Sequence, residues 1–200
     1  MNLSFLARIS ILSMALLPSL AGAQRACQHV KAGRTSLVYG ARHAFLVQAP
    51  PGWVGVVVAG IPAAFHRTSE SWQDGAAVLY VNTFTADSGP AVSPEEAFHK
   101  DSSQFAAKLK SLIVERQSTL QTADGRIALV WAFRGETPTN VEVVAYVREK
   151  TVTPLIVMSA RTEVEYRSAL KAFRTLVRSY EFITANQRAG DGPPCGITRR

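Results

Sequence analysis

The sequence predicts an α+β fold, an α/β/α sandwich in which helices cover a central antiparallel sheet. Short apolar runs separated by turn residues indicate strands that follow one another closely, and such strands pair antiparallel. Two segments have the features of helices, and four expected strands separate them, so the helices can cover one or both faces of the sheet. The 200 residues, 47% hydrophobic and 18% charged, are typical of an ordinary globular domain rather than of a disordered chain.

Residues 1–23 are expected to be a secretory signal peptide. Arg8 precedes an apolar run that Pro18 ends, and Ala21-Gly22-Ala23 supplies the small residues that signal peptidase needs before Gln24. The run is shorter than the about 20 apolar residues of a membrane span, although an uncleaved anchor is the alternative. We therefore expect a periplasmic or secreted protein that is not an integral membrane protein.

Two cysteines lie near opposite ends of the exported chain. Export places Cys27 and Cys195 in an oxidising compartment, where two such thiols tend to pair, and the termini of compact domains are often close in space. A reactive or metal-binding pair is the alternative, but no C-x-x-C motif is present. The sequence thus predicts a single domain over residues 24–184 and a tail, residues 185–200, tethered by a Cys27–Cys195 disulfide.

The first half of the expected domain is strand-rich. Residues 44–49 form a short apolar run that stops at a Pro-Pro-Gly-Trp turn, residues 50–53, with Trp53 expected to fold back onto the core. Residues 54–65 are β-branched and aliphatic but are interrupted by Gly60 and Pro62, which indicates two strand pieces or one strand with a bulge. Residues 76–85 are apolar on both faces, as expected for a central strand.

A helix start follows at Ser93. This residue is the expected N-cap, Pro94 takes the first helical position, and Glu96 completes a capping box. The helix is expected to end near Lys110.

The second half contains four further expected strands and a long amphipathic helix. An Asp124-Gly125 hairpin turn joins the first two of these strands, and a second turn follows at residues 137–140. The strands are expected at residues 112–122, 126–135, 141–150 and 154–161, and the helix at residues 162–182.

Several of these segments together resemble a known fold. They are a strand running into Pro50-Pro51-Gly52-Trp53, a strand with Leu79-Tyr80-Val81-Asn82, a helix, the Asp124-Gly125 hairpin, and a last helix that closes on Phe173, Val177, Ser179, Tyr180 and Phe182. Over residues 44–184 this combination is similar to the PsbP-like fold, which the Ran-binding import factor Mog shares with exported bacterial PsbP-like and DcrB-like proteins. The resemblance implies an α/β/α sandwich and an accessory, chaperone-like or binding role, and it implies no catalytic residue.

The sequence contains no familiar catalytic signature and implies no cofactor. It has no G-x-S-x-G elbow, P-loop, G-x-G-x-x-G, H-E-x-x-H or EF-hand loop. The best metal candidates are Glu95, Glu96, His99 and Asp101, because a carboxylate and an imidazole three or four residues apart share a helix face. First-turn carboxylates also suit a capping box and the helix dipole, and this is the stronger interpretation. A metal-dependent or hydrolytic enzyme built on His99 is therefore the alternative function.

The most regular polar feature is a basic stripe on the last expected helix, formed by Arg167, Lys171, Arg174 and Arg178. With 22 Lys and Arg against 15 Asp and Glu, the formal net charge is +7. A cationic ridge can bind an acidic protein or an anionic envelope surface, and a solvated helix face is the competing interpretation. Nucleic acid is not an expected partner, because the protein is exported and lacks interleaved aromatic residues.

Trp72 is the second candidate contact. It lies in a polar stretch that reads as an exposed loop, where it is either a recognition anchor or a ring packed over the loop. The leading hypothesis is thus an exported, non-enzymatic binding protein that uses Trp72 or the basic stripe. A small-ligand carrier is a third possibility, which a ligand-sized apolar cavity would favour.

Overall fold

The computed structural model describes residues 29–30, 35–40, 43–85, 90–107, 111–135 and 139–184. The expected signal peptide, Cys27, Cys195 and the tail after residue 184 lie outside the described residues, as does most of the turn expected at 137–140.

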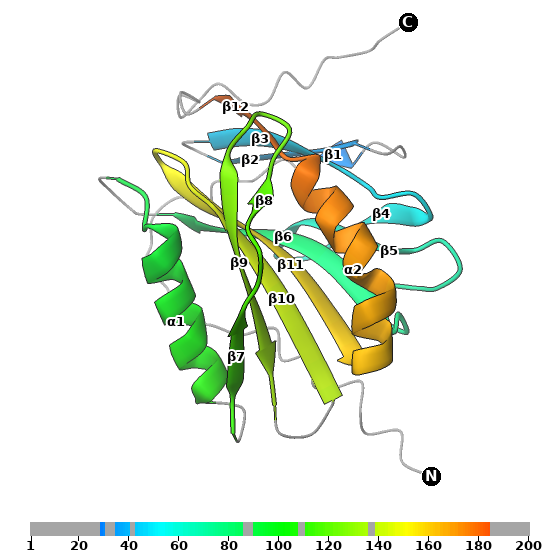
Figure 1. The fold of residues 1–200 in the computed structure, drawn as a ribbon. Coiled ribbons are helices and arrows are strands. Elements are labelled where there is room, and N and C mark those ends of the chain that lie inside the picture. Colours follow the sequence, from blue (N-terminus) through cyan, green and yellow to red (C-terminus); the bar gives the residue numbers. More distant parts are fainter. Residues whose placement is uncertain are drawn as a thin grey trace, which may run out of the picture.

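Eight strands form the main sheet in the described part of the chain (Figure 1). They are β4 (Trp53–Val58), β5 (Ile61–Arg67), β6 (Ala77–Thr85), β7 (Ile113–Arg116), β8 (Leu120–Gln121), β9 (Ile127–Arg134), β10 (Thr139–Val147) and β11 (Val152–Thr162). Their spatial order is β4-β5-β6-β11-β10-β9-β7, with β8 also paired to β9. Every pairing is antiparallel, as the short connections predict, and β6 is an interior strand as expected.

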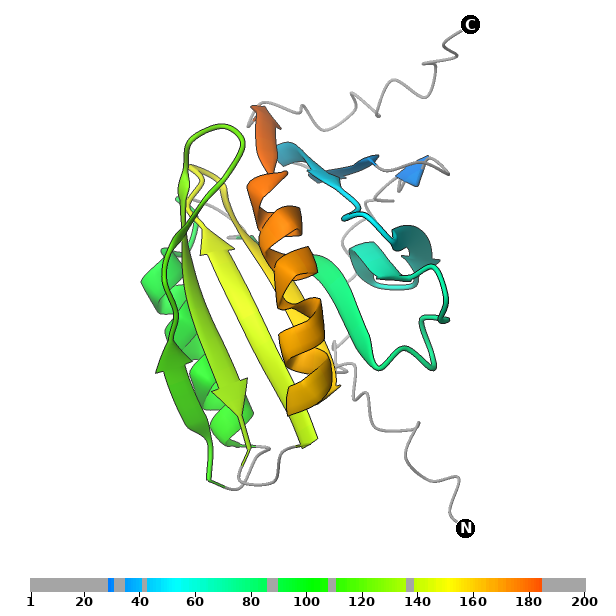
Figure 2. The same cartoon turned by 45° about the vertical axis from the view of Figure 1, so that its right-hand side comes forward.

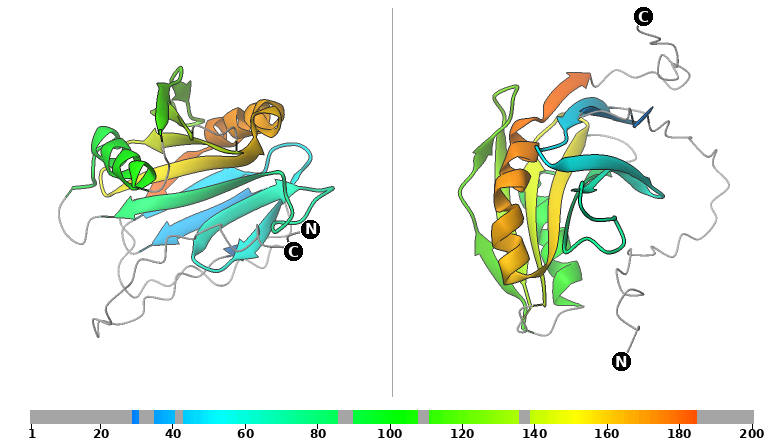
Figure 3. Two further views of the ribbon diagram at one scale, coloured as in Figure 1. Left: turned by 90° about the horizontal axis from the view of Figure 1, so that it is seen from below. Right: turned by 90° about the vertical axis from the view of Figure 1, so that its right-hand side faces the viewer.

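A second, smaller sheet was not predicted from the sequence. It contains β1 (His29–Val30), β2 (Thr35–Gly40), β3 (His43–Gln48) and β12 (Glu181–Thr184), in the order β1-β2-β3-β12. This sheet lies beyond one end of the main sheet (Figure 3). Its buried side chains, among them Phe45 and Val47, belong to the same hydrophobic cluster as the main sheet, so the two sheets share one core.

Two helices lie on opposite faces of the main sheet (Figure 2). They are α1 (Pro94–Ala106) and α2 (Glu163–Arg178). Alternation along β10 shows the division, because Val143 and Ala145 pack in the cluster that includes α2, whereas Val144 and Tyr146 pack in the cluster that includes α1. This arrangement confirms the predicted sandwich.

The start of α1 is the predicted capping box. The hydroxyl of Ser93 accepts a 3.2 Å hydrogen bond from the backbone N–H of Glu96, whose carboxylate accepts a 2.8 Å bond from the N–H of Ser93. The helix ends at Ala106, earlier than expected.

Helix α2 also ends earlier than expected, at Arg178 instead of residue 182. Ser179 forms its C-cap, and the chain then pairs Phe182 with Phe45 as strand β12. Tyr180 is fully buried although it is no longer helical. The apolar spacing that continues past Ser179 therefore reflects burial against the small sheet and not a further helical turn.

The turn before β4 agrees with the prediction. The N–H of Trp53 donates a 3.0 Å hydrogen bond to the carbonyl of Pro50, and Gly52 adopts a φ of +78°. This left-handed conformation favours glycine. Trp53 is 8% exposed, so its ring does fold onto the core. No helix in the described ranges combines the length and the apolar character that a membrane crossing requires.

Candidate binding site on helix α2

The buried face of α2 determines where its basic stripe lies. Tyr166, Ala169, Phe173, Leu176 and Val177 are buried at helical spacing against the main sheet. The residues between them must then face away from the core. All four stripe residues, Arg167, Lys171, Arg174 and Arg178, are exposed.

The stripe is paired with acid only at its N-terminal end. Arg167 forms a 3.1 Å ion pair with Glu163, four residues earlier. Among the described residues, Lys171, Arg174 and Arg178 have no acidic partner within 4.0 Å and no side-chain hydrogen bond. Three cations near the C-terminal half of a helix are favoured by its dipole, and here their charge is left uncompensated by neighbouring side chains.

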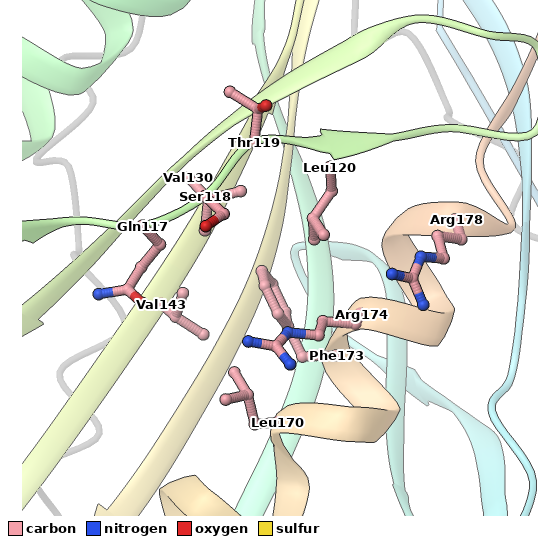
Figure 4. Close-up of a pocket in the computed structure, with 10 residues that line it drawn as sticks. All are labelled: Gln117, Ser118, Thr119, Leu120, Val130, Val143, Leu170, Phe173, Arg174 and Arg178. Atoms are coloured by element: carbon pink, nitrogen blue, oxygen red, sulfur yellow. The ribbon is translucent and has the colours of Figure 1, made fainter.

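Two of these cations border a pocket of about 240 Å³ between α2 and the segment that joins β7 to β8 (Figure 4). Arg174 and Arg178 reach from the helix towards this segment, as Figure 4 shows. The polar side of the pocket also includes Gln117, Ser118 and Thr119. Its apolar lining consists of Leu120, Val130, Val143, Leu170 and Phe173. None of the described residues that line it is acidic.

An irregularity in the edge of the main sheet forms one wall of the pocket. Arg116 pairs with Trp131 and Leu120 pairs with Ala128. Between these pairs the edge chain has three residues, 117–119, where β9 has two. An extra residue of this kind is a β-bulge, which bends a strand and redirects its side chains. The expected single strand over residues 112–122 is therefore divided into β7 and β8.

The bulge leaves polar side chains available. The backbone N–H of Gln117 donates to the carbonyl of Val130 at 2.9 Å, which holds the segment in place. In the described part of the chain, the side chains of Gln117, Ser118 and Thr119 make no hydrogen bond. An amide, two hydroxyls and two guanidinium groups thus surround an apolar floor, an arrangement suited to an anionic group carried on an apolar body.

Trp72 lies on the other side of the main sheet. Its half-buried ring meets the edge of Tyr80, with ring centroids 6.5 Å apart and ring planes 79° apart. Tyr80 packs against the cluster on the α1 face. Trp72 and the basic stripe therefore do not form one continuous surface.

The loop that carries Trp72 is fixed to the start of α2. The guanidinium of Arg67 contacts the carboxylates of Glu70 and Glu165, each at 2.9 Å. The hydrogen bond from Arg67 is the main cause that lowers the pKa of Glu165. Arg161 donates to the backbone carbonyl of Gln73 at 2.8 Å, which holds the middle of the loop.

The four candidate metal ligands have separate partners instead of a common centre. Glu95 pairs with Arg148 at 2.8 Å, and Glu96 accepts the N–H of Ser93, which lowers the pKa of Glu96. The phenol of Tyr146 donates to Asp101 at 2.7 Å.

The fourth candidate, His99, lies with its ring centroid 5.2 Å from that of Phe98. In the ranges that the structure describes, no group of three or more His, Cys, Asp or Glu side chains is placed to hold a metal ion. The capping box and these contacts account for the acidic residues, which is the interpretation that the sequence favoured, and the described residues Glu95, Glu96, His99 and Asp101 do not form a metal-binding group.

Asp101 is a half-buried carboxyl with a structural partner. Burial raises its pKa, and the hydrogen bond from Tyr146 opposes that shift. Burial also raises the pKa of Tyr146, so the phenol keeps its proton and remains the donor.

Sequence reasoning identified the two arginines at the pocket but not its other wall. The segment 117–119 gave no distinct signal, because a bulge depends on its pairing with β9 and not on local composition. The only local sign of the bulge in the sequence was the mixed polar and apolar character of residues 117–120.

Comparison with known proteins finds structural similarity alone. No family model matches the sequence, and no curated protein matches it. The structure is similar to that of a PsbP from the cyanobacterium Synechocystis, with 17% identity and a TM-score of 0.47, over 81% of this chain and 100% of that one.

Two further solved structures are similar. One is LpqN of Mycobacterium tuberculosis, a protein involved in cell envelope biogenesis, with 11% identity and a TM-score of 0.47 over 77% of this chain and 87% of that one. The other is the Ran-binding protein Mog1p of Saccharomyces cerevisiae, with 14% identity and a TM-score of 0.45 over 72% and 93%. PsbP and Mog, which the sequence resembles, are thus both among the similar structures.

Proposed function

We propose that this protein is an exported, non-enzymatic accessory protein that binds an acidic partner protein through the basic face of α2. The observation that carries the proposal is the set of three exposed cations, Lys171, Arg174 and Arg178, which have no acidic partner among the described residues. Export rests on the signal peptide expected from residues 1–23.

Charge and shape both favour this face. Surface cations that merely maintain solubility are commonly interspersed with acids, as Arg167 is with Glu163. The three unpaired cations instead follow one another along α2, and two of them border a concave, partly apolar site. Unpaired charge attracts an oppositely charged partner from a distance, and a pocket beside it supplies short-range contact.

The basic face is a better candidate than the Trp72 loop. The ring of Trp72 is half-buried and meets the edge of Tyr80, and Arg67 and Arg161 hold the loop in place. A ring already packed in this way offers a partner only its remaining face. Trp72 is therefore proposed as no more than a second, separate contact.

The test compares partner capture by two matched variants. In the first, Lys171, Arg174 and Arg178 are all changed to Gln. In the second, Lys100, Arg148 and Lys150, which are exposed cations on or near α1, are changed to Gln. Both variants lose three positive charges, and the α1-side variant also loses the ion pair between Arg148 and Glu95, so it is the harsher control for a general loss of charge.

We expect the wild type and the α1-side variant to capture an envelope protein that the α2 variant does not capture. Its capture should weaken as salt is added, since exposed charges are screened over about 8–10 Å at ordinary ionic strength. Equal capture by both variants would refute the proposal. If the α2 variant lost binding to vesicles rich in phosphatidylglycerol but captured proteins as the wild type does, the partner of the basic face would be a lipid surface and not a protein.

A further inference from the structure

We propose that the pocket between α2 and residues 117–120 binds an organic carboxylate, with the apolar body of the ligand in contact with Leu120 and Leu170. This inference rests on the proposed function and extends it, because it names a carboxylate as the chemical group of the acidic partner that the basic face would bind. It applies equally to the carboxylate of a polypeptide C-terminus and to that of a small free acid.

The charged part of the site points to a carboxylate. Arg174 and Arg178 are four residues apart on one helix, so both guanidinium groups can reach the same ligand. A guanidinium matches the planar carboxylate through two parallel hydrogen bonds. Ser118 and Thr119 also line the pocket, and their hydroxyls have no partner in the described ranges.

The floor of the site points to an apolar body next to that carboxylate. Val130, Val143 and Phe173 are buried core residues, but Leu120 and Leu170, which also line the pocket, are only half-buried. A bare inorganic anion would engage the arginines and leave these two leucines exposed to water. A ligand with an aliphatic or aromatic group covers them as well, at about 25 cal/mol for each Å² of apolar surface.

The size of the site limits the ligand. The volume of about 240 Å³ is below the range of about 300–1,000 Å³ that is typical of sites for drug-sized ligands. The pocket therefore suits a group comparable to one amino-acid residue, such as a terminal leucine with its free carboxylate.

Calorimetric titration with N-acetyl-L-leucine tests the inference directly. This probe has the carboxylate and a branched apolar side chain but no amine. Acetate lacks the apolar body, and N-acetyl-L-leucinamide lacks the charge, so the wild type should bind both of these more weakly. A peptide that ends in leucine, with a free or an amidated C-terminus, distinguishes a polypeptide source from a small acid.

Three single variants locate the binding. Arg174→Gln and Arg178→Gln should each weaken N-acetyl-L-leucine binding about tenfold, the size expected for loss of one charge-assisted interaction. Lys150→Gln is the control, since Lys150 is an exposed cation near α1 that belongs neither to the basic face nor to the pocket lining. All three side chains are exposed, so the fold should tolerate each change.

The outcomes are decisive in both directions. Tighter binding of the acid than of its amide, lost in the two arginine variants and kept in Lys150→Gln, would support the pocket. Equal binding of acid and amide, an equal loss in Lys150→Gln, or no binding of any carboxylate probe would overturn it. Partner capture that still depends on the α2 cations would then leave the proposed function intact and remove only the carboxylate pocket.

Discussion

The phenol of Tyr180 donates a 2.8 Å hydrogen bond to Oε1 of Glu149 inside the protein. The same oxygen forms a 2.7 Å ion pair with Nε of Arg126, which also pairs with Asp124. Asp124 in turn accepts the backbone N–H of Phe182 at 2.9 Å. This network joins the chain directly after α2 to the β8–β9 turn, and so it holds the end of the helix beside the pocket.

Removal of the Tyr180 hydroxyl should destabilise the fold. Tyr180→Phe leaves the buried Glu149 with one donor fewer, so the free energy of unfolding should fall by about 1–3 kcal/mol. Urea unfolding measures the change. Tyr166→Phe is the control, because the Tyr166 hydroxyl makes no hydrogen bond within the described ranges, and its effect should stay within about 0.5 kcal/mol. Equal losses in the two variants would contradict this role for the network.

The pH dependence of the free energy of unfolding should reflect the raised pKa of Glu149. Burial raises the pKa of this carboxyl above its ordinary value of 4.5, and the contacts with Tyr180 and Arg126 oppose that shift only in part. A raised pKa means that the native state binds the proton more tightly than the unfolded chain does. The contribution of Glu149 to stability is then greatest below about pH 4.5 and declines as the pH rises through the raised pKa.

Comparison with Glu149→Gln isolates this effect. The stability of the wild type relative to the variant should fall with rising pH across that window, as measured by urea unfolding in a pH series. A relative stability that rises with pH would mean that Arg126 and Tyr180 more than offset the burial of the charge.

Trp72 should contribute to folding without contributing to the α2 site. Its ring is half-buried on Tyr80, so Trp72→Ala should lower the free energy of unfolding by about 1–2 kcal/mol. Binding of N-acetyl-L-leucine should be unchanged, because Trp72 lies on the α1 side of the sheet. Weaker binding in a variant that remains folded by circular dichroism would show that the two sites are coupled.

The predicted Cys27–Cys195 disulfide lies outside the described residues, and the described strands nearest to it in the sequence belong to one sheet. The chain next to Cys27 is β1 and the chain before Cys195 is β12, at opposite edges of the same small sheet. Three strand spacings of about 4.8 Å separate these edges, by about 14 Å, and eleven extended residues after Thr184 reach up to about 36 Å.

We expect the mature protein to be lighter by two hydrogen atoms without reductant, and reduction to lower its stability by up to about 4 kcal/mol. Intact mass spectrometry measures the first and urea unfolding the second. A non-reduced mass that corresponds to two free thiols would refute the bridge.

Local signals in the sequence predicted the elements whose structure depends on neighbouring residues. Ser93 and Glu96 form their capping box within one helical turn, and Gly52 and Gly125 mark turns through their own positive φ values. The basic stripe was likewise visible, because helical spacing alone places Arg174 and Arg178 on one face.

Features that depend on distant pairing were not predicted. Strand β12 continues the apolar spacing of α2, and only its pairing with β3 ends the helix at Arg178. The wall of the pocket depends on the extra residue at 117–119 relative to β9. For the same reason the sequence indicated a cationic surface but no cavity beside it.

Side-chain NMR shows whether a ligand binds at Arg174 and Arg178, where we propose the functional site. The Nε–H signals of ¹⁵N-labelled arginines are followed while N-acetyl-L-leucine is added, with Arg174→Gln and Arg178→Gln used to assign them. We expect saturable shifts of these two signals and unchanged signals for Arg148 and Arg161. Uniform small shifts of every arginine, or shifts that spare Arg174 and Arg178, would contradict this proposal.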